Sequence, residues 1–235
     1  MPPIYIACAA NFFVPLKQLV ADYKARHAPE ANILISSGSS GSLYRQIKFG
    51  SPHQLFLSAD RFFPQQLERE QLVLTDSRQT YAIGQLVFWQ PGLKLESLDE
   101  LTSLQSPLAI ANPKTAPYGQ AAREVLNRLA PNKSWQLITG TSIAQTHQFI
   151  SSGNVPAGFT SRSLIPASTS AVLEVPSEWH QPLIQQMVLT RKAKDQPQAT
   201  QLFAYLSSPD ARTIIKAHGY LLPEKPALKE AQQPL

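Results

Sequence analysis

The sequence has few of the residues and patterns that mark membrane, disulfide-bonded or metal-binding proteins. Cys8 is the only cysteine among 235 residues, so the chain forms no intrachain disulfide and holds no cysteine cluster for a metal. No apolar run approaches the roughly 18 residues of a membrane-spanning helix. The histidines form no closely spaced pair of the kind that binds zinc. The content of 43% hydrophobic and 16% charged residues is typical of a globular protein.

Positive charge is in excess but is not clustered. The chain has 21 Lys and Arg against 16 Asp and Glu, for a net charge of +5 at neutral pH. Its densest basic run, residues 191–194, is only four residues long. Nucleic-acid binding would favour a clustered basic face with interleaved aromatic residues, so we expect no nucleic-acid partner. Attraction of small anions is compatible with the charge but does not follow from it.

Short β-rich runs alternate along the chain with segments of helical periodicity, as in α/β proteins. Residues 4–9 predict a buried strand, and apolar residues at helical spacing over 16–23 predict the helix that follows. Further strands are predicted at 32–36, 55–58, 80–89, 108–112, 135–139, 157–161 and 186–191. Further helices are predicted around 43–47 and at 61–70, from 117, and at 143–152, 197–206 and 209–218. The Pro- and Gln-rich tail from Pro223 predicts disorder.

The run from Thr80 to Trp89 is long for one strand and is broken by Gly84. It indicates a crossing between two lobes, and residues 186–191 indicate the return. We therefore predict an α/β fold of two βαβ lobes joined by two crossing strands, with a ligand cleft between them. The predicted division of the chain is residues 1–83 and 187–235 in lobe 1, and 84–186 in lobe 2. In such sheets ligands bind at the carboxyl ends of the strands.

Four predicted strand-to-helix junctions are small or polar and carry no charge. They are Ala-Ala-Asn at 9–11, Ser-Ser-Gly-Ser-Ser-Gly-Ser at 36–42, Thr-Ala-Pro-Tyr-Gly at 115–119 and Gly-Thr-Ser-Ile at 140–143. A helix N-terminus presents unpaired N–H groups and about half a positive charge, so it favours anions. Ser, Thr and Asn are also ordinary helix caps, but the second junction exceeds what capping requires. It lacks the Lys-Ser/Thr ending of a P-loop.

At these junctions the chain resembles the molybdate-binding proteins of bacterial molybdate ABC importers, within the type II periplasmic binding proteins. The resemblance covers residues 4–223, and its motifs begin with Ala-Ala-Asn-Phe at 9–12 and Ser-Ser-Gly-Ser-Ser-Gly at 36–41. The other motifs are Leu-Ser-Ala-Asp at 57–60, Tyr-Ala-Ile-Gly-Gln-Leu-Val-Phe-Trp at 81–89, Ala-Pro-Tyr-Gly at 116–119, Ile-Ala-Gln-Thr at 143–146, Ser-Gly-Asn at 152–154 and Gly-Tyr-Leu-Leu-Pro at 219–223.

The resemblance implies a function, a partner and a location. It implies a monomeric binding protein, not an enzyme, that needs no cofactor and captures molybdate or tungstate. The partner would be the membrane permease of an ABC importer. The location would be periplasmic or otherwise extracytoplasmic, with a signal peptide absent from this sequence and Met1 added. A cytoplasmic protein without a signal is the alternative, because residues 1–3 lead straight into a strand.

The resemblance also implies which residues bind the oxyanion. Asn11 stands where many relatives have serine and a subgroup has asparagine. Ser40 would contribute its hydroxyl and its backbone N–H, and we expect this hydroxyl to be exposed and to matter little for stability. Tyr118 and Ile143 would contribute backbone N–H groups. Ala10 falls where some relatives have threonine, so its contact could only be through the backbone. No direct cation ligand is expected, because the metal arrives as its oxyanion.

Two other classes of function stay open on the sequence alone. A regulatory effector domain on the same fold would normally follow a DNA-binding segment, and none stands before Ile4. An enzyme would need a nucleophile, a base or a cofactor anchor, whereas the junctions offer neutral donors and no Gly-x-Ser-x-Gly elbow. Asp60 would repel a dianion, so we expect it to cap a helix or to join the lobes. His147 is expected to be a packed helix residue.

Overall fold

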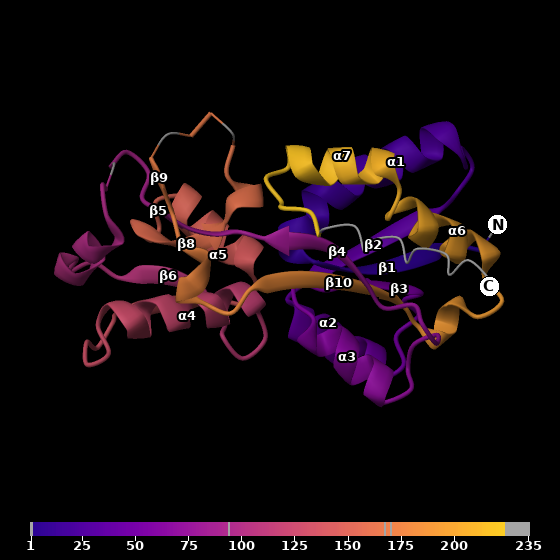
Figure 1. Ribbon diagram of the computed structural model, residues 1–235, viewed down its shortest axis with the longest axis horizontal. Helices are drawn as coiled ribbons and strands as arrows, with labels where there is room; N and C mark the ends of the chain where they lie inside the picture. The colour runs from indigo at the N-terminus through magenta and orange to yellow at the C-terminus, as the bar shows by residue number, and fades with distance from the viewer. Residues whose placement is uncertain (1, 94, 167, 170, 224–235) are drawn as a thin grey trace, which may run out of the picture.

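The computed structural model describes residues 2–93, 95–166, 168–169 and 171–223. The chain forms two α/β lobes that lie side by side along the long axis of the molecule (Figure 1). Each lobe contains a five-stranded sheet with helices packed on it. The predicted two-lobe α/β fold is therefore confirmed. The tail that was predicted to be disordered lies, beyond Pro223, outside the described residues.

The first lobe is built on a mixed sheet with the strand order β2-β1-β3-β10-β4. Its strands are β1 (Ile4–Ala9), β2 (Ile33–Gly38), β3 (Leu55–Leu57), β4 (Gln79–Gly84) and β10 (Leu183–Leu189). Its helices are α1 (Phe13–Arg26), α2 (Ser40–Lys48), α3 (Phe62–Arg69), α6 (Pro197–Tyr205) and α7 (Pro209–Ala217), with short 3-10 turns η1 (Ala10–Phe12) and η5 (Arg191–Ala193). Strand β1 is parallel to β2 and β3, whereas β10 is antiparallel to β3 and β4.

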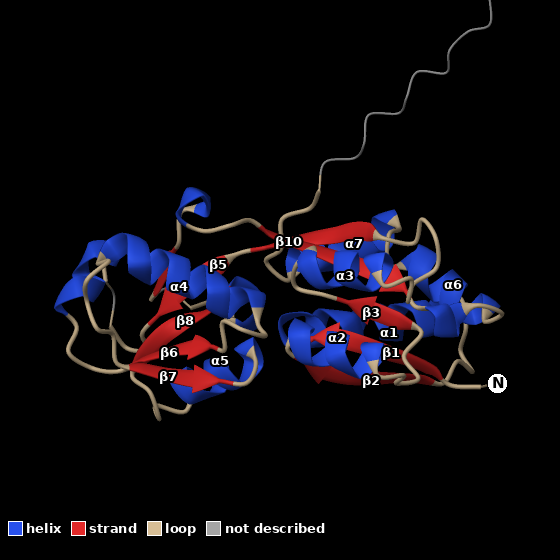
Figure 2. Cartoon of the chain, turned by 90° about the horizontal axis from the view of Figure 1, so that it is seen from below, coloured by secondary structure: helices blue, strands red, loops and turns tan. Residues whose placement is uncertain are grey.

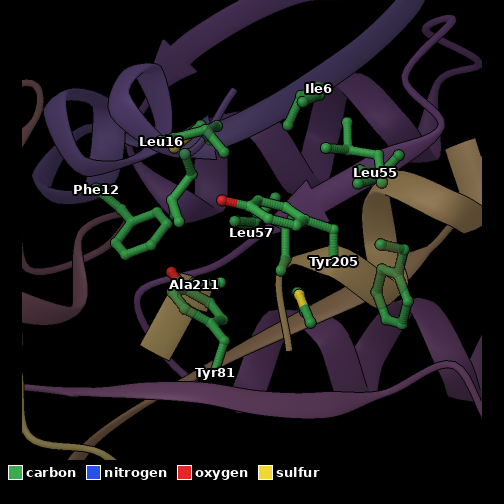
Figure 3. Close-up of a cluster of buried hydrophobic side chains, with 14 of the residues drawn as sticks. Ile6, Phe12, Leu16, Leu55, Leu57, Tyr81, Tyr205 and Ala211 are labelled. Atoms are coloured by element: carbon green, nitrogen blue, oxygen red, sulfur yellow. The ribbon is translucent and has the colours of Figure 1, made fainter. Parts of the chain in front are cut away.

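The core of the first lobe explains why these runs become strands and helices. Ile6 of β1 and Leu16 of α1 are fully buried, and both belong to one hydrophobic cluster with Leu55 of β3 and Tyr81 of β4. Figure 3 shows these side chains meeting between the sheet and the helices. Because β1 is a central strand with helices on both faces, its run is apolar throughout instead of alternating.

The second lobe repeats the plan with the strand order β7-β6-β8-β5-β9. Its strands are β5 (Leu86–Trp89), β6 (Leu108–Ala111), β7 (Leu137–Gly140), β8 (Ala157–Ser161) and β9 (Val172–Glu174). Its helices are α4 (Pro117–Leu129) and α5 (Ile143–Ser151), with 3-10 turns η2 (Leu98–Ser103), η3 (Arg162–Leu164) and η4 (Ser177–Trp179). Strand β6 is parallel to β7 and β8, and β5 is antiparallel to β8 and β9.

Two segments cross between the lobes (Figures 1 and 2). The predicted long strand of residues 80–89 is two strands in different sheets, because β4 ends at Gly84 and β5 begins at Leu86. The return segment enters the first sheet at Leu183, which pairs with Gly84. Residues 183–186 therefore pair in the first sheet, although the predicted division gives lobe 2 the whole of 84–186. The division of the chain into lobes stays a prediction.

Candidate functional site

The four uncharged junctions lie where the two lobes face each other. Strands β1 and β2 of the first lobe and β6 and β7 of the second end at these junctions, and parallel strands bring their carboxyl ends to one edge of a sheet. The second and third junctions touch, because the Gly41 N–H donates to the carbonyl oxygen of Thr115 at 2.9 Å. A Cβ on Gly41 would lie 3.1 Å from the Thr115 backbone. The lobes are thus closed against each other at this point.

A small cavity, with about 10 Å³ of space for a water-sized sphere, lies at this meeting point. Eleven residues line it, and none of these described residues carries a charge: Ala9, Ala10, Asn11, Gly38, Ser39, Ser40, Ala59, Ala116, Pro117, Tyr118 and Ile143. The cavity thus brings together, from both lobes, all five residues that the resemblance implies. Their contact with a ligand stays a prediction.

Asn11 is the most buried polar side chain of the cavity, with an exposed fraction of 0%. Its Nδ2 donates to Gln185 Oε1 at 3.0 Å and to the Tyr220 hydroxyl at 2.8 Å. Its carbonyl oxygen accepts hydrogen bonds from the Tyr220 hydroxyl at 2.9 Å and from Ser163 Oγ at 3.1 Å. Its Oδ1 is buried and finds no partner among the described residues. Buried polar atoms are rarely left unpaired, so this end of the amide is a candidate ligand contact.

Ser40 begins α2 and is buried, with 1% exposure. Its Oγ accepts a hydrogen bond from the Ala59 N–H at 2.9 Å, so the hydroxyl hydrogen is available to a ligand in the cavity. The expectation of an exposed Ser40 hydroxyl is wrong, because the hydroxyl is buried and accepts a hydrogen bond from the loop after β3; its effect on stability stays a prediction. Ser39, at the N-cap, bonds to Ser42 instead. Ser37 is exposed on β2.

The second lobe contributes the first turns of α4 and α5. The N–H groups of Gly119 and Gln120 donate to the Ala116 carbonyl, and Tyr118 N–H is among the first-turn donors that a helix leaves without an internal acceptor. The Tyr118 hydroxyl is buried away from solvent, which raises its pKa above the ordinary value. Ile143 is the first residue of α5, so its N–H is likewise a first-turn donor.

Asp60 and His147 have the structural roles expected from the sequence. Asp60 Oδ1 accepts hydrogen bonds from the Phe63 N–H at 3.2 Å, in the first turn of α3, and from Ser58 Oγ at 2.8 Å. Burial raises the pKa of Asp60 to about 6. His147 stacks on Trp89 with ring centroids 5.1 Å apart, and burial lowers its pKa. Neither side chain lines the cavity.

Two site neighbours were missed from the sequence. Gln185 and Tyr220 contact Asn11 across separations of 174 and 209 residues, which no local pattern reveals. The one available signal was the pair Gln185-Gln186 inside the otherwise apolar run of β10, since a buried glutamine needs hydrogen-bond partners. Among the described residues, no group of three or more His, Cys, Asp or Glu could hold a metal. None of the described helices is long and apolar enough to cross a membrane.

The comparisons with known proteins agree with the motifs. The model of the bacterial extracellular solute-binding protein family matches residues 4–221. The chain is 38% identical over 226 residues to the molybdate-binding protein ModA of Azotobacter vinelandii, covering 92% of this chain and 89% of that protein. It is 34% identical over 225 residues to ModA of Rhodobacter capsulatus, covering 93% of this chain and 88% of that protein.

Solved structures give the same result. The periplasmic molybdate-binding protein of Azotobacter vinelandii matches with a TM-score of 0.86 at 33% identity, over 94% of this chain and 100% of that chain. The sulfate-binding protein SubI from Mycobacterium tuberculosis H37Rv matches with a TM-score of 0.77 over 95% of this chain and 88% of that chain, but at 12% identity it shares the fold alone. The resemblance drawn from the motifs is confirmed, and the chain belongs to the bacterial extracellular solute-binding protein family.

Proposed function

We propose that this chain captures molybdate, or the similar tungstate ion, outside the cytoplasm and delivers it to the membrane permease of an ABC importer. The observation that carries the proposal is the uncharged cavity between the lobes, which unites the five expected residues in one place. The relatives named as molybdate-binding proteins match almost the whole chain. We further propose that the protein works as a monomer, without a cofactor or a nucleic-acid partner.

The proposed site holds a dianion with neutral donors. Helices α2, α4 and α5 all begin at the cavity, and each N-terminus carries roughly half a positive charge on its free N–H groups. Ser40 adds a hydroxyl, Asn11 adds a donor when the NH₂ end of its amide faces the cavity, and Ala10 lines the cavity beside them. Donors fixed by secondary structure need no reorganisation when the anion arrives, and hydrogen bonds to a charged acceptor are the stronger kind.

The same donors explain selectivity. Hydrogenphosphate carries an O–H group that needs an acceptor, and a site made of donors does not satisfy it. Sulfate has the charge of molybdate but is smaller, so donors fixed at the spacing of a larger ion bind it less closely. Molybdate and tungstate are alike in size and charge, and the cavity has no feature that separates them.

Entry and release require the lobes to move. Asn11 and Ser40 are 0% and 1% exposed in the closed arrangement, so an ion reaches them only when the lobes separate. The two crossings at Gln85 and before Leu183 are the places where such a hinge motion would occur. A membrane permease that pulls the lobes apart would therefore open the site.

An enzyme on this fold is the weaker alternative. Tyr118 is the only residue lining the described cavity with a titratable side chain, and its hydroxyl accepts hydrogen bonds from Ser161 Oγ and Gln185 Nε2. Burial raises its pKa, which disfavours the ionised form that a base or nucleophile needs.

Calorimetric titration of the purified protein tests the proposal. Molybdate and tungstate should bind with similar affinity, whereas sulfate and phosphate at equal concentration should bind far more weakly. Sulfate that competes on equal terms with molybdate would contradict the assignment, even though the fold stands. Size-exclusion chromatography with and without molybdate checks the expected monomer.

A further inference from the structure

One buried side chain links the two halves of the proposed site. Gln185 lies on β10 with an exposed fraction of 0%, beside the crossing between the lobes. Its Oε1 lies 3.0 Å from Asn11 Nδ2 and 2.9 Å from the Tyr81 hydroxyl, and its Nε2 lies 3.1 Å from the Tyr118 hydroxyl. Asn11 belongs to the first lobe and Tyr118 to the second, so the Gln185 amide contacts a cavity residue from each.

The backbone is shaped to place this amide. The pairing register of β10 with β4 shifts between Gln185 and Gln186, and such a bulge re-aims the side chains of a strand. Gln186 points elsewhere and bonds to Arg78 and Thr80. Across the sheet, a Cβ on Gly84 would collide with the Tyr118 hydroxyl and with Gln185 Nε2. The missing side chain at Gly84 therefore leaves the space in which Gln185 meets Tyr118.

The orientation of the Asn11 amide decides what the cavity offers to a ligand. With Nδ2 turned toward Gln185, the unpaired buried end of Asn11 is its oxygen. An oxygen there would repel an oxyanion and would accept the proton of hydrogenphosphate. With the amide turned over, the same position holds an NH₂ group, which donates to an oxyanion.

Turning over both amides keeps the contacts of Gln185 paired and redirects the Tyr220 hydroxyl, which then donates to Asn11 Oδ1 instead of to the Asn11 carbonyl. The oxygen and nitrogen ends of an amide are nearly equal in size, so the hydrogen-bond network fixes the orientation. In the turned arrangement Gln185 Nε2 donates to Asn11 Oδ1 and to the Tyr81 hydroxyl, and the Tyr118 hydroxyl donates to Gln185 Oε1. Tyr81 then donates to the Ser58 carbonyl, which lies 3.1 Å away. The Asn11 carbonyl keeps the hydrogen bond from Ser163 Oγ, and the Asn11 NH₂ is left to donate to a ligand.

We propose that Gln185 is a positioning residue that sets the Asn11 amide, so that the cavity presents a donor and rejects hydrogenphosphate. It acts through Asn11 and Tyr118 and does not touch the ligand. The proposal rests on the proposed function, because it takes the ligand to be an oxyanion in this cavity. It adds a determinant of specificity that lies behind the cavity wall.

The test compares Gln185→Met with Gln186→Met, which removes another buried amide, 8% exposed, from the neighbouring position of the same strand. Gln186→Met should bind molybdate like the parent. Gln185→Met should bind molybdate roughly tenfold or more weakly, because it releases the amide that donates to a charged acceptor. Its discrimination between molybdate and phosphate should also narrow, since the freed Asn11 can present its oxygen. Melting curves of both variants without ligand measure separately how far each substitution lowers the stability of the protein.

A pH series with Gln185→Glu separates positioning from packing. An ionised carboxylate only accepts hydrogen bonds, whereas the protonated acid donates one. Affinity of Gln185→Glu for molybdate, relative to the parent at each pH, should therefore rise as the pH falls from about 8 to about 6, because burial raises a carboxyl pKa into this range. The molybdate affinity of Gln185→Met, relative to the parent at each pH, should not change over this range.

Two outcomes would contradict the positioning role of Gln185. A Gln185→Met protein that binds molybdate and phosphate like Gln186→Met, or a flat pH ratio for Gln185→Glu, overturns the positioning role. If Gln185→Met does not fold, the pH series alone decides. A parent protein that binds no oxyanion defeats the proposed function itself, which is a different outcome.

Discussion

Ser40→Ala tests the proposal that Ser40, at the end of the serine-rich junction, binds the oxyanion. The Ser40 hydroxyl already accepts the Ala59 N–H at 2.9 Å, so its one hydrogen is free to donate into the cavity. The variant keeps the backbone N–H and loses only that donor. Removing a hydrogen bond to a charged acceptor costs about 1.5–3 kcal/mol, which corresponds to roughly 10- to 150-fold weaker binding of molybdate at about 1.4 kcal/mol per decade.

The same change has a cost in the apo protein. Ala59 is 2% exposed, so its N–H loses its acceptor in a buried place. Leaving a buried donor unpaired costs about 1–3 kcal/mol of unfolding free energy. In a domain of this size each kcal/mol lowers the Tm by roughly 2–4 °C, so the apo Ser40→Ala protein should melt several degrees below the parent. Titration at 25 °C still measures binding to folded protein.

Ser37→Ala is the matched control from the same junction. Its side chain is exposed on β2 and does not line the cavity, so both molybdate affinity and the apo Tm should equal those of the parent. Calorimetric titration and melting curves on the two variants make the comparison. Parent-like binding by Ser40→Ala, or a larger loss in Ser37→Ala, would show that the oxyanion lies at the other end of this loop.

Three further predictions concern charge, closure and pH. Because no charged side chain lines the cavity, molybdate affinity should depend weakly on salt, and a single Lys→Ala or Arg→Ala change that abolishes binding would reveal a missed counter-ion. Gly41→Ala places a methyl 3.1 Å from the Thr115 backbone of the other lobe and 2.8 Å from the Phe63 ring of its own lobe, so titration should show weaker binding and the apo Tm should fall by as much as the Phe63 ring must shift; unchanged affinity would mean that the lobes close without this contact. Burial raises the Asp60 pKa from 3.8 to about 6, so its contribution to stability is present below pH 3.8 and is lost as the pH rises through about 6. Urea unfolding between pH 3.8 and about pH 6 should show that the free energy of unfolding of Asp60→Asn lacks this decline. A variant whose free energy of unfolding falls with pH as steeply as that of the parent would argue against the raised pKa.

Much of the fold could be predicted because its strands and helices carry their own patterns. The apolar run of β1 and the helical spacing of α1 are both local signals, and Gly84 marked the break between β4 and β5. The start of β10 was predicted too late, at 186 instead of Leu183, because two glutamines interrupt its apolar run. Strand β9 was missed because an edge strand of three partly exposed residues has almost no pattern.

The residues that line the candidate cavity could be predicted from the sequence, whereas the residues packed behind them could not. Asn11 and Ser40 stood at junctions whose small, uncharged character is visible in the sequence. The burial of Ser40 under the loop at Ala59 and the role of Gln185 arise from contacts between distant segments. Such contacts follow from the packing of the sheets, so residue types at a junction indicate what the cavity contains and not what holds it in place.

A neutral cavity has a consequence for how a bound ion is released. In the proposed site Asn11 and Ser40 belong to one lobe, whereas Tyr118 and Ile143 belong to the other, and neither lobe has a counter-ion in the cavity that would hold the dianion alone. The ion is then bound tightly only when the lobes are closed, because only then do both sets of donors contact it. Separating the lobes removes half of the donors and lets water reach the anion. A permease that opens the crossings would therefore lower the affinity without touching the ligand, whereas a lysine in either lobe would keep the ion bound after opening.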